Sequence, residues 1–128
     1  MSSVTLPKSQ PTMVAVWILR VLVAALFLFA GFAKLSGQAM MVEEFDVVGL
    51  GQGFRYLTGA LELIGGVAVL MPAFSPLGAA LLLLVDIGAF FAQVFAIHMD
   101  FIHTIVIAIV ILTLIYLQRD ALKARFGG

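Results

Sequence analysis

Four ionisable side chains interrupt or end the long apolar stretches of this sequence: Arg20, Lys34, Glu62 and Asp86. A charge at the centre of a bilayer costs roughly 2.5–3.5 kcal/mol on insertion scales, so such side chains turn inward and pair with one another. Paired carboxylates and cations in apolar surroundings can bind a polar group of a ligand or pass on a proton. The same pairing can also serve only to fix how the helices pack. The sequence leaves both interpretations open.

Small residues accompany these charges on three predicted helix faces. At 100° per residue, the residues of each face lie close to one line along the helix. Small side chains let a neighbouring helix approach closely, which is typical of packing faces inside membrane bundles. We therefore expect the charges to point into the bundle from the following faces: Arg20, Ala24, Phe27, Gly31 and Lys34; Arg55, Gly59, Glu62 and Gly66; Ala79, Asp86, Ala89 and Gln93, with Leu82 and Phe90.

These residues predict one intramembrane polar cluster. Counted from the ends of the predicted spans nearest the termini, Arg20, Glu62 and Asp86 all lie at a depth of roughly 10–14 Å. We expect Arg20 to reach one or both carboxylates, with Gln93 close by. Two carboxylates and one guanidinium leave a surplus negative charge. Either one carboxyl group is therefore protonated at neutral pH, or Lys34 reaches down to offset the charge.

A second polar cluster is predicted at the outer face. His98, Asp100 and His103 straddle a short turn between two apolar stretches, and Glu43 and Glu44 lie in the one long loop. Imidazoles and carboxylates are acceptable ligands for zinc, copper or non-haem iron. The spacing matches no dedicated metal motif, so we assign no metal ligand. A pH-responsive or hydrogen-bonding cap, and histidines that merely lie at the membrane surface, are the alternatives.

The composition predicts an integral membrane protein of one domain. Of the 128 residues, 63% are hydrophobic and 11% charged, against roughly 45–50% and about 25% in soluble domains. Seven basic and seven acidic residues cancel, which argues against nucleic acid as a partner. There is no cysteine, and no haem, flavin or nucleotide motif is present. Any redox role therefore needs a bound cofactor or a partner protein.

Four apolar stretches of about 20 residues predict an all-α, integral membrane four-helix bundle. The first exceeds the usual apolar length of a signal peptide and contains Arg20, so we expect it to be retained. A helical turn at 40–48 is expected to end at a glycine. The expected spans are residues 13–35, 54–71, 77–97 and 101–117. The chain is thus expected to consist of a disordered arm at 1–12, a transmembrane domain at 13–118 and a basic tail at 119–128.

The distribution of lysine and arginine predicts the orientation in the cell's inner membrane. With four spans, both termini lie on one side of the bilayer. Cytoplasmic segments carry the excess of positive charge. Both termini are therefore expected to be cytoplasmic, since they hold Lys8, Arg119, Lys123 and Arg125 against Lys34 and Arg55 on the other side.

The chain resembles the DoxX family of small bacterial four-helix membrane proteins. The resemblance begins with Arg20 and the segment LFLFAGFAKL at 26–35. It continues in GALELIGGVAVL at 59–70, followed by Pro72 and a helix start at 76–79. It extends over nearly the whole chain beyond the polar arm.

The family pattern places an arginine, a lysine and a glutamate where Arg20, Lys34 and Glu62 stand. Asp86, His98 and His103 are less general, so chemistry at these positions follows less directly from the resemblance.

The resemblance implies several roles. The family is similar to the membrane subunit of an archaeal thiosulfate:quinone oxidoreductase, which implies a membrane component of a quinone-linked redox system. Arg20 or Lys34 would then donate to quinone carbonyls, and Glu62 or Asp86 would relay protons. Other members resemble partners of secreted redox or metal-handling proteins. Apart from the redox role, two alternatives stay open: a non-enzymatic scaffold or assembly factor that docks a partner at the acidic residues 43–46, and a small-solute transporter built as a homo-oligomer.

Overall fold

Helices make up every element of the residues that the structure, a computed structural model, describes: 9–97 and 101–126. This confirms the all-α prediction. The elements are α1 (Gln10–Leu35), α2 (Ala39–Val48), α3 (Gln52–Leu70), α4 (Ser75–Ala92), the π-helical turn η1 (Gln93–Ile97), α5 (Ile102–Leu117) and α6 (Arg119–Phe126).

Within residues 9–97 and 101–126, three helical segments are long and apolar enough to cross a membrane: α1, α3, and α4 continued by η1. The fourth apolar helix, α5, has 16 residues, somewhat fewer than the ~20 that span about 30 Å of hydrocarbon. The chain is therefore a membrane protein with three to four apolar helices that could span the bilayer.

The ends of the helices differ in detail from those expected. α1 begins at Gln10 rather than at residue 13, because Ser9 accepts a hydrogen bond from the Thr12 backbone N–H at 3.3 Å and Pro11 suits the first turn. Residues 1–8 of the expected arm lie outside the described residues. The basic tail expected at 119–128 contains a short helix, α6. The predicted helix at 40–48 is confirmed as α2, which ends at Gly49 with a φ of 83°.

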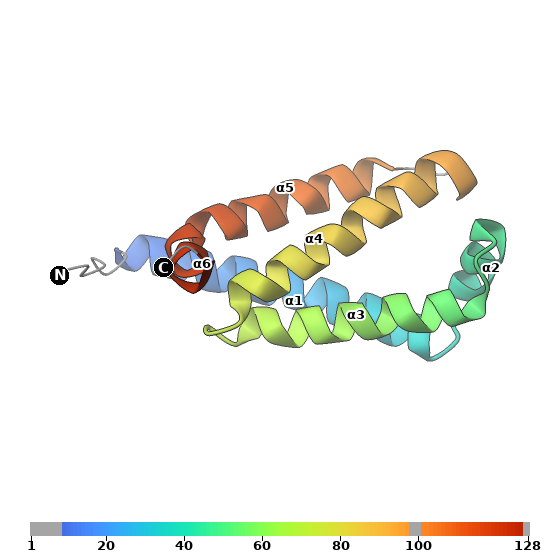
Figure 1. Ribbon diagram of the computed structural model, residues 1–128, viewed down its shortest axis with the longest axis horizontal. Helices are drawn as coiled ribbons and strands as arrows, with labels where there is room; N and C mark the ends of the chain where they lie inside the picture. The colour runs from blue at the N-terminus through green and yellow to red at the C-terminus, as the bar shows by residue number, and fades with distance from the viewer. Residues whose placement is uncertain (1–8, 98–100, 127–128) are drawn as a thin grey trace.

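The long helices form two antiparallel pairs that separate toward one end of the molecule. α1 and α3 lie side by side, and α4 and α5 diverge from them toward the end where α2 lies across the bundle (Figure 1). At the opposite end, near the chain termini, the apolar side chains are tightly packed. This core consists of Val16, Val23, Phe27, Val69, Ala79, Leu82, Ile111 and Leu114.

Glycines set the close approach of α3 to both of its neighbours. A Cβ atom on Gly31 would lie 2.8 Å from the Gly59 carbonyl oxygen, and one on Gly59 would lie 3.1 Å from the Lys34 Cβ. On the other side, a Cβ atom on Gly78 would lie 2.9 Å from the Gly65 carbonyl oxygen. These contacts confirm the small-residue packing expected beside Glu62.

The glycine contact between α1 and α3 can be tested with Gly31→Ala. The added methyl group meets the Gly59 carbonyl, a backbone atom that moves only if the helices separate, so we expect a loss of about 1–3 kcal/mol in stability. The measurement is thermal unfolding in detergent. Gly53→Ala is the matched control, since its Cβ atom would meet nothing within 4 Å. Equal melting temperatures for the two variants would refute the close contact.

Candidate functional site

A cavity of about 750 Å³ lies between the two helix pairs, at the end of the bundle that α2 covers. Its wall is mostly apolar, with polar side chains contributed by α1, α2, α3, α4, η1 and α5. We call these polar side chains the cavity cluster: Lys34, Glu44, Thr58, Glu62, Asp86, Gln93, His103 and Thr104.

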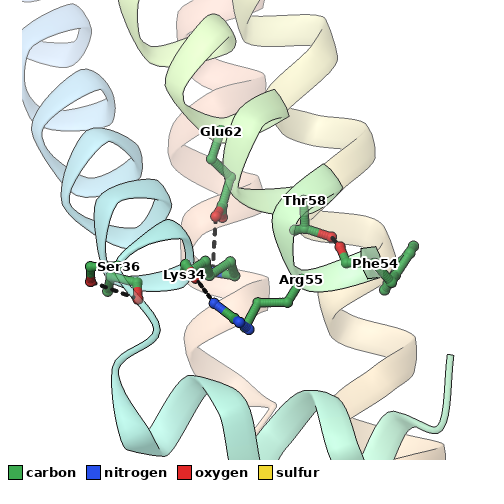
Figure 2. A network of polar contacts seen from close by, with 7 residues as sticks. Lys34, Ser36, Phe54, Arg55, Thr58 and Glu62 are labelled. Carbon is green, nitrogen blue, oxygen red and sulfur yellow. Dashed lines mark hydrogen bonds and ion pairs between the residues drawn. The ribbon is translucent and has the colours of Figure 1, made fainter. Parts of the chain in front are cut away.

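An ion pair joins α1 to α3 at this cavity. The Lys34 Nζ lies 2.9 Å from the Glu62 Oε1 (Figure 2), and Glu62 is only 5% exposed. The close contact of Gly31 with Gly59 brings the two helices near enough for the side chains to meet. The sequence left two ways to offset the surplus negative charge of Glu62 and Asp86: protonation of one carboxyl group, or a contact made by Lys34. The contact made by Lys34 is present.

Arg55 holds the end of α1 next to this ion pair. Its guanidinium donates to the Lys34 carbonyl oxygen, one of the last carbonyls of α1 (Figure 2), and to the Gln52 Oε1 at 2.6 Å. Gln52 in turn donates to the Asp46 Oδ1 at 2.7 Å. Arg55 shares the inward face of Gly59 and Glu62, as the sequence predicts, and it is buried in the structure.

Asp86 lies in the wall of the cavity on α4 and is 4% exposed. It makes no hydrogen bond or ion pair with any other residue of the two described ranges. Two helical turns further along, the Oε1 atom of Gln93 is buried and likewise has no hydrogen-bond partner in this part of the chain. Two buried acceptors of the predicted intramembrane cluster thus belong to the cavity without a donor from the described residues.

Two residues of the predicted outer cluster reach the same cavity. His103, on the first turn of α5, and Glu44, on α2, both line it, whereas Glu43 is exposed and does not. His98 and Asp100 lie outside the described residues. Among the residues that are described, no group of three or more histidine, aspartate and glutamate side chains could hold a metal ion.

The expected contact of Arg20 with Glu62 or Asp86 is wrong. Arg20 donates to the Ser75 Oγ at 3.2 Å and to the Gln118 Oε1 at 2.7 and 3.0 Å, and its guanidinium lies 4.5 Å from the centre of the Trp17 ring. No carboxylate of the described residues lies within ion-pair distance of it.

The axial offset between α1 and α4 explains the difference. Arg20 is level with Ser75, the first residue of α4, because about ten residues of α1 project beyond that point. Asp86 lies eleven residues further along α4, or about 16 Å at 1.5 Å per residue. An arginine side chain cannot bridge this distance.

Ser75 and Gln118 were not predicted as partners. Both are buried, and they join the start of α4 and the end of α5 to α1 through Arg20. They are neutral, so a search for complementary charges passes over them. The available signal was their position, because each is a polar residue directly at the end of an apolar helix.

Residues 18–117 match the model of the DoxX-like family. The chain belongs to the DoxX-like family. The match extends from α1 to the last residue of α5 and contains Lys34, Glu62 and Asp86, so the resemblance stated from the sequence is confirmed. No curated protein and no solved structure matches this DoxX-like protein.

A pair of double-mutant cycles distinguishes the observed contacts from the expected one. Combining Lys34→Gln with Glu62→Gln removes two partners of one ion pair, so we expect a coupling of about 0.5–3 kcal/mol in the free energy of unfolding. Arg20→Gln and Glu62→Gln touch separate groups and should add within about 0.3–0.5 kcal/mol. Unfolding in detergent supplies both values. A larger coupling for Arg20 with Glu62 would contradict the structure.

Proposed function

We propose that this DoxX-like chain is the membrane component of a quinone-linked redox system and that its cavity binds the quinone headgroup. The supporting observation is an apolar cavity that combines a lateral opening with the charged groups of Lys34, Glu62 and Asp86. A volume near 750 Å³ lies within the range of about 300–1,000 Å³ usual for small-molecule pockets.

The exposure of the cavity wall supports entry from the bilayer. Leu57 on α3 and Leu84 on α4 both line the cavity, yet they are 53% and 67% exposed. The cavity therefore extends to the outer surface of the bundle between these two helices. A hydrophobic molecule dissolved in lipid could enter there without crossing water.

The polar groups of the cavity suit a redox-active headgroup. Lys34 can donate a hydrogen bond to a carbonyl oxygen, and Glu62 and Asp86 can accept or release protons as the headgroup changes its redox state. Arg20 has no part in this proposal, because it is engaged at the other end of the bundle. The sequence has no cysteine and no flavin or haem motif, so we assign the second electron carrier to a partner protein, either secreted or membrane-bound.

We further propose that α5 is a fourth span and that both termini are cytoplasmic in the inner membrane. Its 16 residues can be accommodated by local thinning of the bilayer. The positive charges of the terminal segments support this orientation.

Because the chain contains no cysteine, single cysteines can report its topology. We expect a membrane-impermeant maleimide to label Glu43→Cys in intact spheroplasts, and to label Ser9→Cys and Asp120→Cys only after permeabilisation. All three side chains are exposed in the structure. Labelling of Asp120→Cys but not Ser9→Cys in intact spheroplasts would mean that α5 does not cross the membrane.

A scaffold or assembly role is the second candidate, and the surface of α2 favours it. Glu43, Asp46, Met40 and Val47 are exposed on this helix, so acidic and apolar groups are together available to a partner protein. Cross-linking from α2 that captures a partner irrespective of changes in the cavity would favour this role over quinone binding. A homo-oligomeric transporter has no specific support in the geometry.

Quinone binding is tested by extracting lipids from the purified protein and measuring the bound quinone. We expect quinone with the wild type and with the control Glu43→Gln, which lies outside the cavity. Lys34→Met should weaken binding about tenfold or more, because a hydrogen bond to a charged group contributes about 1.5–3 kcal/mol. Absence of quinone from the wild type, with no binding of added quinone, would refute the proposal.

A further inference from the structure

Three donor groups of the cavity cluster already contact acceptors within the protein. The Lys34 Nζ lies against Glu62 at 2.9 Å. The Thr58 hydroxyl donates to the Phe54 carbonyl oxygen at 2.9 Å, and the Thr104 hydroxyl donates to the Phe101 carbonyl oxygen. A ligand that offers only acceptors would have to compete with these internal contacts for Lys34, Thr58 and Thr104. The remaining donors of the cluster are the N–H groups of Gln93 and His103.

Several acceptors of the cavity have no donor among the described residues. The Asp86 carboxyl group and the Gln93 Oε1 are buried without a donor in the described part of the chain, and Glu44 also has no partner there. A buried polar group left unpaired destabilises the protein, so a ligand that supplies donors forms hydrogen bonds that the described residues do not make.

We propose that the cavity binds the reduced, dihydroxy form of the headgroup, the quinol, more tightly than the quinone. Asp86 and Gln93 are then the acceptors for its two hydroxyl groups. This inference rests on the proposed function. A quinone presents only carbonyl acceptors, whereas a quinol presents two O–H donors.

The spacing of the two acceptors fits a ring with hydroxyl groups at opposite ends. Asp86 and Gln93 lie seven residues apart on one face of the helix, which is roughly 10–11 Å along its axis. A 1,4-dihydroxy ring whose hydroxyls each donate a bond of about 2.7 Å spans roughly 11 Å between acceptors. Gly88 and Ala89 line the cavity between them, so small side chains leave room for the ring along α4.

Tighter binding of the quinol has an electrochemical consequence. A site that prefers the reduced form raises the midpoint potential of the bound couple. For a two-electron couple, each tenfold preference raises it by about 30 mV. Bound quinone would therefore be a stronger oxidant than quinone free in the bilayer.

The test measures equilibrium binding of decyl-ubiquinone and of its quinol to the purified protein in detergent, without oxygen. We expect the quinol to bind at least tenfold more tightly. Asp86→Asn should weaken quinol binding at least tenfold and quinone binding less than threefold, because a neutral amide oxygen is a weaker acceptor than a carboxylate and a quinone carbonyl makes no hydrogen bond to the carboxylate of Asp86. Gln93→Met keeps the length of the side chain, removes the second acceptor and should also reduce the preference. Glu43→Gln is the control.

The outcomes separate the two proposals. Equal binding of both forms by the wild type overturns the quinol preference and leaves the quinone site standing. Binding of neither form overturns both. Binding of decylammonium that depends on Asp86, with no binding of the quinol, assigns the cavity to lipophilic cations and also overturns both. If Asp86→Asn does not fold, the quinol preference is still tested by the ratio of quinol to quinone affinity of the wild type and by the effect of Gln93→Met on that ratio.

Discussion

The ion pair between Lys34 and Glu62, made where α1 and α3 touch through glycines, is the interaction on which the described architecture depends. Neither charge could face lipid alone at an acceptable cost, and removal of one partner leaves the other uncompensated. The pair is 2.9 Å long and buried, and Arg55 holds the backbone of Lys34 from the side. α1 and α3 therefore form a fixed wall, from which α4 and α5 diverge to leave the cavity.

The two ends of the bundle use buried polar groups differently. Near the termini, Arg20 is surrounded by Ser75, Gln118 and Trp17, and it joins α1 to α4 and to the end of α5 beside the apolar core. Near α2, the helices are separated, and Asp86 has no protein partner in the described residues. Polar groups with neutral partners in tight packing suit a structural role. Unpaired groups in a cavity suit a ligand, which is the basis of our proposals.

Sequence periodicity could place residues around a helix axis but not along it relative to a neighbouring helix. It correctly predicted that Arg20, Glu62 and Asp86 point inward, since all three are buried. It also predicted the close packing at the glycines beside Glu62. It failed for the partner of Arg20, because depth was counted from assumed helix ends at a common level. α1 projects beyond the start of α4, an offset that depends on the packing of four helices.

The sequence by itself determined the membrane class, the helices, the family and the inward faces, because hydropathy, glycine spacing and charge are local properties of the chain. Only the tertiary structure decided which inward groups meet. Ser75 and Gln118 come to Arg20 from positions 55 and 98 residues away in the chain. Asp86 stays unpaired among the described residues because α4 diverges from α1 at its depth. Side-chain partners across a bundle depend on the axial offsets and angles between helices, and these arise only when all the packing faces are satisfied together.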